Sequence, residues 1–290
     1  MINLSHFVTL RETAKSLGLG VGDTLRFIWS YYASRLRNAD LQAQTEVSIF
    51  YAGARRKVAI RKNGWDWSVL DEVFVRRLYD LPSTQVRRVL DLGGNIGAAT
   101  LALAWDHPGA EICAVEPIPT NLAVLQRNIE LNQVRARVVP AAAGVESGKV
   151  TFNVSSDPRC HSSSMATLGG TEALEVNVVT VPQLMELMGW DEFDLLKIDI
   201  EGGEREILGS RAQWLTKVRY IVGEGHDGVG YDLAKIRADL EPLGFDVKLV
   251  ERNEGAATVF QAERVRAADL AAGDAENKVQ AANGANYAGN

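Results

Sequence analysis

The chain has 290 residues and a formal net charge of −6, and it is long enough to bury a full-sized core. Its 46% apolar and 23% charged residues are typical of an ordinary globular protein. The acidic balance argues against a nucleic-acid partner, because binding phosphates requires a clustered basic surface. The sequence has no run of about 18 apolar residues, so we expect no membrane span. Two cysteines, Cys113 and Cys160, and an N-terminus without a signal peptide's apolar core predict a cytoplasmic protein.

Residues 1–84 are expected to form an N-terminal helical cap. Apolar residues recur at helical spacing in 22–38, and a second amphipathic helix is predicted over 68–81, before Pro82. The first strand signal is "KVAIRK", residues 57–62. The first helix could cover an acceptor site or form a homodimer face. Its predicted apolar face consists of Leu25, Ile28, Trp29, Tyr32 and Leu36.

From residue 85 the pattern alternates between strands and helices, which is typical of a doubly wound, mostly parallel sheet. We expect one α/β domain over residues 85–264, in which "FDVKLVE" and "ATVFQAE" form a terminal antiparallel hairpin. The helix over 120–132 is predicted to bury Leu122, Leu125, Ile129 and Leu131. The tail, residues 265–290, is rich in Ala, Gly and Asn and is expected to be disordered.

The stretch "VLDLGGNIGAAT" predicts a ligand loop between a strand and a helix. Glycines at 93, 94 and 97 let a ligand approach the backbone, and a nucleotide-like ligand suits the start of the following helix. The glycine order differs from the dinucleotide pattern G-x-G-x-x-G. Asp91 at the strand end would repel a pyrophosphate but attract an amine. A ligand that combines an ammonium group with adenosine fits better, which points to S-adenosylmethionine.

A second acid supports this interpretation. Glu116 ends the next strand roughly 20 residues after the glycine loop, the spacing of an acid that accepts both ribose hydroxyls. The glycine loop alone could be a tight turn, but the loop together with this acid favours a cofactor site.

Four stretches in order resemble the FkbM family of S-adenosylmethionine-dependent methyltransferases, over roughly residues 65–262. They are "VLDLGGNIGAAT", "AVEPIPTNLAVLQRNIELN", "VVPAAAGVESGKVTF" and "FDLLKIDIEGGEREIL". The resemblance implies a class I (Rossmann-like) methyltransferase fold. It also implies transfer of a methyl group, usually to a hydroxyl on a sugar or a secondary metabolite, with S-adenosylhomocysteine as the other product.

The resemblance also implies positions for the cofactor. Glu116 would bind the ribose, with Pro117 beside it, Ala142 would lie beside the adenine, and Asp199 would lie near the sulfonium. The cofactor loop would be formed by Asp91, Gly93, Asn95 and Gly97. The chain departs from the family pattern at Gly223, where a larger apolar residue is expected before Glu224.

The end of the strand over 193–202 is expected to carry part of the chemistry, because strand C-termini hold the reactive groups in open α/β sheets. Alternation places Lys197, Asp199 and Glu201 on one face. Such charges are costly in an apolar strand unless they pair or bind a ligand. The structural alternative is an ion pair of Lys197 with a carboxylate, and a helix cap from Glu201 or Glu204.

His226 is the first candidate for the general base that takes the proton of the acceptor, because an unperturbed imidazole has a pKa of about 6.5. Asp199 and Glu224 complete the predicted catalytic set. His161, in the Ser-rich loop after residue 155, is the rival base. A divalent metal ion on Asp199, Glu224 and His226 would be chemically reasonable, but no tight ligand motif demands one.

The sequence therefore predicts an O-methyltransferase that acts on a small-molecule acceptor. Two alternatives remain open. One is N-methylation of an amine or peptide, because only the acceptor pocket would differ. The other is a non-catalytic cofactor-binding partner protein, against which the three carboxylates at strand ends, Asp91, Glu116 and Asp199, weigh.

Overall fold

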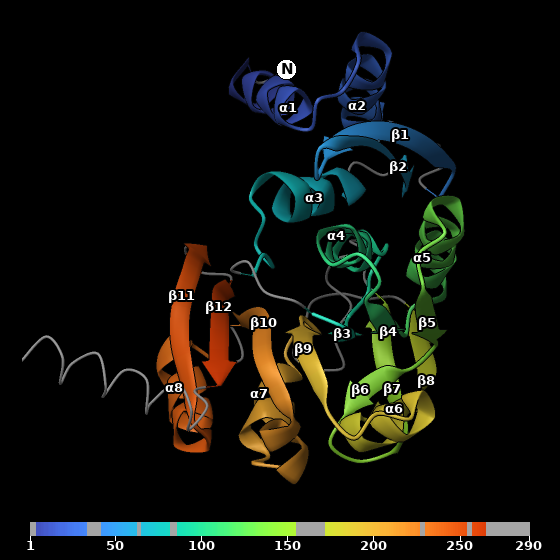
Figure 1. Cartoon of the computed structure of the whole chain (residues 1–290). Coiled ribbons are helices and arrows are strands. Elements are labelled where there is room, and N and C mark those ends of the chain that lie inside the picture. Colours follow the sequence, from blue (N-terminus) through green and yellow to red (C-terminus); the bar gives the residue numbers. More distant parts are fainter. Residues whose placement is uncertain are drawn as a thin grey trace, which may run out of the picture.

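A sheet of seven strands forms the centre of the protein in this computed structural model (Figure 1). The structure describes residues 4–33, 42–62, 65–81, 86–154, 172–226, 230–253 and 257–264. The strands are β3 (Arg88–Leu92), β4 (Glu111–Val115), β5 (Ala136–Val139), β9 (Phe193–Ile198), β10 (Val218–His226), β11 (Phe245–Asn253) and β12 (Ala257–Arg264). They lie in the order β11-β12-β10-β9-β3-β4-β5.

The strand directions confirm the predicted fold class. Five adjacent strands run parallel to one another: β5, β4, β3, β9 and β10. β12 runs antiparallel to β10 and β11 and so forms the expected terminal hairpin. The inner strands read as continuous apolar runs because helices cover both of their faces, and Val89, Leu90 and Leu92 of β3 are almost fully buried.

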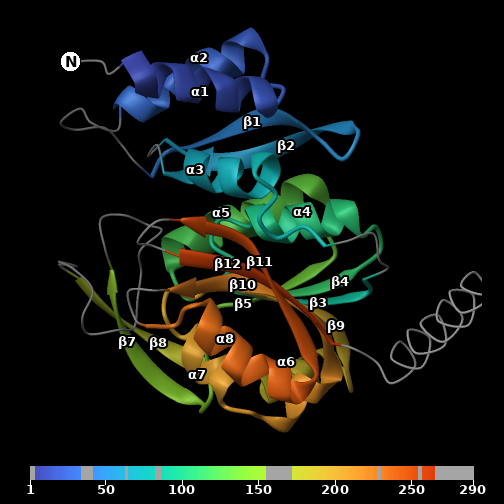
Figure 2. The ribbon, with the colours of Figure 1, turned by 90° about the vertical axis from the view of Figure 1, so that its left-hand side faces the viewer.

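Helices lie on both faces of this sheet (Figure 2). On one face lie α4 (Ala98–Asp106) and α5 (Pro119–Asn132), and on the other α6 (Val181–Met188), α7 (Glu204–Gly209) and α8 (Leu233–Leu240). Capping residues mark the first turns of two of these helices. Thr180 and Gln183 form a capping box on α6, and the Asp232 carboxylate accepts from the Lys235 N–H at the start of α8. None of the helices in the described ranges has the length and apolarity needed to cross a membrane.

The N-terminal region stacks on the α4 and α5 side of the sheet (Figure 2). It contains α1 (Leu4–Ser16), α2 (Val21–Ala33), the short helix α3 (Asp66–Leu70) and a π-helical turn (Asp71–Val75). It also contains the antiparallel hairpin of β1 (Gln44–Tyr51) and β2 (Ala54–Arg61), which departs from the helical cap expected from the sequence. The signal for β1 is an alternation in which Val47, Ile49 and Tyr51 are buried.

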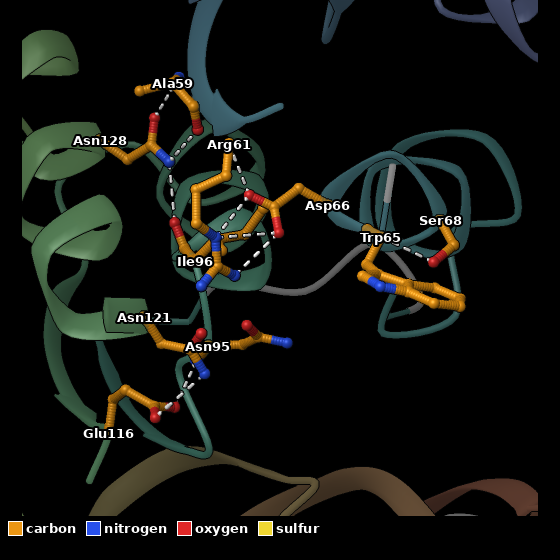
Figure 3. Close-up of polar contacts among 10 residues, drawn as sticks. All are labelled: Ala59, Arg61, Trp65, Asp66, Ser68, Asn95, Ile96, Glu116, Asn121 and Asn128. Carbon is orange, nitrogen blue, oxygen red and sulfur yellow. Dashed lines mark hydrogen bonds and ion pairs between the residues drawn. The ribbon is translucent and has the colours of Figure 1, made fainter. Parts of the chain in front are cut away.

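A buried ion pair joins the end of this hairpin to α3 (Figure 3). The guanidinium of Arg61 donates to both carboxylate oxygens of Asp66 at 2.8–3.2 Å, and both side chains are about 1–2% exposed. Arg61 belongs to the basic stretch "ARRKVAIRK", but it is part of the core rather than of a charged surface.

A second, small sheet has three strands in the order β6-β8-β7. Its strands are β6 (Ala142–Gly144), β7 (Gly148–Val154) and β8 (Glu172–Thr180). The loop with Cys160 and the rival base His161 lies outside the described residues, as does the tail from residue 265.

Candidate active site

The glycine loop follows β3 and lies against the ends of two neighbouring strands. The N–H groups of Gly93 and Gly94 donate to the Val115 carbonyl of β4 at 3.0 and 2.9 Å. Gly93 has a φ of 84°, and a Cβ there would lie 1.8 Å from the Asp199 carbonyl oxygen. A side chain is therefore excluded at this position by both backbone conformation and space.

A cavity of about 290 Å³ opens beside this loop. Six of the residues predicted to bind the cofactor line it: Gly93, Asn95, Glu116, Pro117, Ala142 and Asp199. Its walls come from the ends of β3, β4 and β9 and from the small sheet, in which Gly144 and Val178 also line the cavity. A crevice at the carboxyl ends of parallel strands is the usual place for a nucleotide-like ligand.

Glu116 is the most constrained acid in this cavity (Figure 3). Its Oε2 accepts from the Asn95 N–H at 2.8 Å, and its Oε1 accepts from the Ile118 N–H at 2.8 Å and the Asn121 amide at 3.3 Å. Burial raises the pKa of Glu116 to about 7, although these N–H donors work to lower it. The carboxylate is thus held in place and ready to accept further hydrogen bonds.

Asp91 and Gly97 lie behind the cavity rather than in its wall. Asp91 is fully buried, where Oδ2 accepts from the Thr100 hydroxyl at 2.6 Å and Oδ1 lies 3.3 Å from Lys197 Nζ. The expectation that the Asp91 carboxylate faces a ligand amine therefore does not agree with the geometry. The strand register explains this, because Asp91 of β3 lies directly opposite Lys197 of β9.

Lys197 thus takes the ion-pair role that the sequence left open as an alternative, with Asp91 as its partner. Its ammonium also donates to the Gly93 carbonyl at 2.7 Å. Burial works to lower the pKa of Lys197, but the charges of Asp91 and Asp199 outweigh it, and the pKa is raised. Lys197 is therefore a cation that supports the glycine loop from below.

A second cavity, of about 260 Å³, shares Gly93, Asn95, Asp199 and Glu201 with the first. The three predicted catalytic residues, Asp199, Glu224 and His226, all line it. The N-terminal region supplies a further wall, formed by Val69, Glu72, Val73 and Tyr79. The two cavities therefore adjoin at the end of β9.

Tyr79 is the site residue that sequence reasoning missed. Its hydroxyl lies 3.0 Å from Asp199 Oδ2 and 3.2 Å from Glu224 Oε1, and the Lys197 ammonium lies 5.2 Å from the centre of its ring. Burial and the neighbouring carboxylates hold the pKa of Tyr79 well above its ordinary value. The hydroxyl is consequently neutral and acts as a hydrogen-bond donor. No motif in "RRLYDLP" distinguishes it from a core tyrosine.

His226 lies between two carboxylates. Its Nε2 is 3.4 Å from Glu201 Oε2 and its Nδ1 is 3.3 Å from Glu204 Oε1. Burial works to lower the pKa of His226, but these two acids raise it to about 12. These two acids favour the protonated ring, so the surroundings of His226 do not suit the predicted base that titrates near working pH.

Glu204, which was considered as a helix cap, holds the turn after β9. Its buried carboxylate accepts from the N–H groups of Ile200 and Gly202 at 2.7 and 2.8 Å. Glu201 adopts a φ of 58° in this turn, which brings its side chain toward His226. The turn thus fixes both anionic partners of the imidazolium.

Glu224 is the acid most inclined to carry a proton. Burial raises its pKa to about 8, and the charge of Asp199 adds to the effect. One ligand atom each from Asp199, Glu224 and His226 lie within 4.8 Å of one another. A divalent cation would find the two carboxylates there, but the two ring nitrogens of His226 already face Glu201 and Glu204.

The unexpected Gly223 has a steric explanation. A Cβ at this position would lie 2.2 Å from the Ile198 carbonyl oxygen and 2.7 Å from its Cγ2. β10 therefore approaches β9 too closely for the larger apolar residue that the sequence led us to expect. The close approach brings Glu224 next to Asp199.

Comparison with known proteins identifies the family of this chain. Residues 91–247, more than half of the chain, match the family model described as the methyltransferase FkbM domain. The chain is 30% identical over 210 residues to the 31-O-demethyl-FK506 methyltransferase FkbM of Streptomyces tacrolimicus, which covers 61% of this chain and 80% of that protein. It is 25% identical over 167 residues to the hexuronic acid methyltransferase AglP of Haloferax volcanii. That match covers 57% of this chain and 66% of AglP.

Among solved structures, M. jannaschii TYW2 in complex with AdoMet is similar with a TM-score of 0.44 and 17% identity. The match covers 79% of this chain and 90% of that one.

Proposed function

Because the chain belongs to the FkbM family of methyltransferases, we propose that it transfers the methyl group of S-adenosylmethionine to a hydroxyl of a sugar or a secondary metabolite. The methyl donor is the family's cofactor. One observation supports the proposal above all others: Asp199 lines both cavities, so a donor in the first and an acceptor in the second would meet at its carboxylate.

The first cavity suits the donor. Glu116 would accept hydrogen bonds from the ribose hydroxyls, and Ala142 would lie beside the adenine. Gly93 and Asp199 would hold the methionine part, and S-adenosylmethionine would supply the methyl group next to the second cavity.

The second cavity suits a hydroxyl-bearing acceptor. Its polar lining combines carboxyls and the Tyr79 phenol with the Asn95 amide, the Lys197 ammonium and the His226 ring, all of which hydrogen-bond to hydroxyls. Its small apolar wall includes Val69, Val73, Ala98, Ala99 and Ala257. The name of one relative, the 31-O-demethyl-FK506 methyltransferase, supports an oxygen acceptor, and that of another, the hexuronic acid methyltransferase, supports an acceptor derived from a sugar.

We assign the base to Asp199 rather than to His226. S-adenosylmethionine would supply the methyl group, with S-adenosylhomocysteine as the leaving group when the acceptor oxygen bonds to the methyl carbon, and the Asp199 carboxylate would take the hydroxyl proton. Glu224, carrying a proton, and Tyr79 orient this carboxylate and the acceptor. His226 holds the turn after β9 through its two ion pairs.

The test is methyl transfer from isotope-labelled S-adenosylmethionine to a panel of sugars and polyol metabolites, each paired with its amino analogue. We expect labelled product from the hydroxyl compounds, with Asp199→Asn inactive. Labelling of the amino analogues alone would favour N-methylation. Cofactor binding without any transfer would favour the non-catalytic partner protein.

The exposed face of α2 supports our proposal of a homodimer. Val21, Leu25 and Trp29 are spaced one helical turn apart and are 81%, 64% and 67% exposed, whereas Phe27 packs inward. The apolar face predicted for this helix thus points outward at Leu25 and Trp29. Sedimentation should show a dimer that Leu25→Glu dissociates, and a monomeric wild type would exclude it.

A further inference from the structure

We propose that Asn128 is a positioning residue that joins the N-terminal hairpin to the cofactor loop, so that the hairpin controls the affinity for the methyl donor. Asn128 is not among the described residues that line the two cavities. The inference rests on the donor half of the proposed function and does not depend on the acceptor.

The side chain of Asn128 connects three segments of the chain (Figure 3). Its Oδ1 accepts from the Ala59 N–H of β2 at 2.7 Å, and its Nδ2 donates to the Ala59 carbonyl at 2.9 Å. The same Nδ2 donates to the Ile96 carbonyl of the cofactor loop at 2.8 Å. Asn128 is fully buried on α5, so water does not compete for these bonds.

The Ile96 carbonyl lies in a stretch where the backbone has left regular structure. Asn95 and Gly97 on either side have φ values of 48° and 85°, and Ile96 is fully buried. A buried carbonyl needs a donor, and Asn128 provides one. Without it, the peptide groups around Ile96 lose the contact that fixes their orientation.

The orientation of this backbone matters for the donor, because the N–H of the preceding residue, Asn95, binds Glu116. The Asn95 N–H donates to Glu116 Oε2 at 2.8 Å, and both residues line the first cavity. A displaced loop would therefore disturb the acid assigned to the ribose. Asn128 thus affects the affinity for the donor without contacting the donor.

One face of α5 contacts both the cofactor loop and Glu116. Asn121, Leu125 and Asn128 share this face at spacings of four and three residues. Asn121 bonds to Glu116, and Leu125 packs so closely that a Cβ on Gly94 would lie 2.5 Å from its Cδ1. The sequence predicted an inward stripe of Leu122, Leu125, Ile129 and Leu131; Leu125 is buried, the other three are half-buried, and the buried face also carries Asn121, Val124 and Asn128.

The first experiment is calorimetric titration of Asn128→Ala with S-adenosylhomocysteine. The matched control is Asn132→Ala, since Asn132 lies one turn later and donates to the Lys57 carbonyl of the same β2 strand at 2.9 Å. We expect Asn128→Ala to bind about tenfold more weakly than wild type, because a buried carbonyl is left unpaired in the loop. Asn132→Ala should bind like wild type. Equal affinity for all three proteins would overturn the inference.

A second measurement uses the wild-type protein and does not depend on how well the variants fold. Coupling between binding sites is reciprocal, so donor binding must in turn stabilise the hairpin. Hydrogen exchange is compared with and without S-adenosylhomocysteine. The ligand should slow exchange in β2, residues 54–61, more than it slows exchange in β11 at the sheet edge. Slowing confined to amides that line the first cavity would contradict the coupling. Failure of the wild type to bind at all would instead reject the donor site.

Discussion

The hydroxyl of Tyr79 lies 3.0 Å from Asp199 Oδ2, although the two residues are 120 positions apart in the chain. The same hydroxyl lies 3.2 Å from Glu224 Oε1. One O–H cannot form two strong hydrogen bonds at once, so the two carboxyls share this donor. A proton on Glu224, whose pKa is raised to about 8, would remove this competition.

Removal of this hydroxyl should impair catalysis but not donor binding. In Tyr79→Phe the ring still packs against Lys197, while Asp199 and Glu224 lose their common partner. We expect methyl transfer to fall roughly 100-fold, as for other groups that orient a proton transfer. Calorimetric titration should give unchanged affinity for S-adenosylhomocysteine. Full activity in this variant would refute the role of Tyr79.

Donor binding should depend on pH through Glu116. Its pKa is about 7 in the free protein, and only the carboxylate can accept hydroxyls while holding the N–H groups of Asn95 and Ile118. The affinity for S-adenosylhomocysteine should be constant above pH 7. It should fall by about tenfold per pH unit as the pH drops below that value. Glu116→Gln should bind weakly at every pH. A flat wild-type profile between about pH 5.5 and 8 would contradict this assignment.

His226 should contribute stability that decreases as the pH rises. Its pKa is about 12 in the folded protein against about 6.5 when unfolded, so the contribution is complete below pH 6.5 and is lost toward pH 12. Between about pH 8.5 and 9.5, the wild type should lose about 1.4 kcal/mol of unfolding free energy relative to His226→Gln. Urea denaturation of both proteins across this pH range measures the difference. Parallel curves would show that the ring is neutral.

The close approach of β10 to β9 predicts that Gly223→Ala is destabilising. Its Cβ would lie 2.2 Å from the Ile198 carbonyl oxygen, so the strands must separate. We expect a loss of about 1–3 kcal/mol or more in thermal or urea unfolding. The control is Gly148→Ala in β7, where a Cβ meets no atom within 4 Å, and its effect should stay within about 0.5 kcal/mol. Similar stability for the two variants would argue against the steric account.

Strand-end patterns predicted much of the site because parallel strands bring their carboxyl ends to one edge. Glu116 after β4 and Asp199 after β9 therefore lie at the same cavity. The same pattern did not determine which way an acid points. Asp91 also ends a strand, but the register places Lys197 opposite, and the two charges pair beneath the loop.

Features that depend on tertiary contacts were beyond sequence reasoning. Tyr79 meets Asp199 across 120 positions of sequence, and no local pattern encodes that contact. The charge of His226 depends on Glu201 and Glu204, which a turn with positive φ brings close. Apolar periodicity in α5 does not predict Asn128, because two asparagines share the buried face of this helix with Val124 and Leu125.

The most direct test of the account is calorimetric titration of the purified protein with S-adenosylhomocysteine, carried out in parallel on Glu116→Ala and Glu224→Gln. The account predicts binding by the wild type, loss of at least about 100-fold in affinity for Glu116→Ala, and near wild-type affinity for Glu224→Gln. This result would separate a donor cavity at Glu116 from an acceptor cavity at Glu224. Equal loss in both variants, or unchanged binding by Glu116→Ala, would contradict the division of the site into these two cavities.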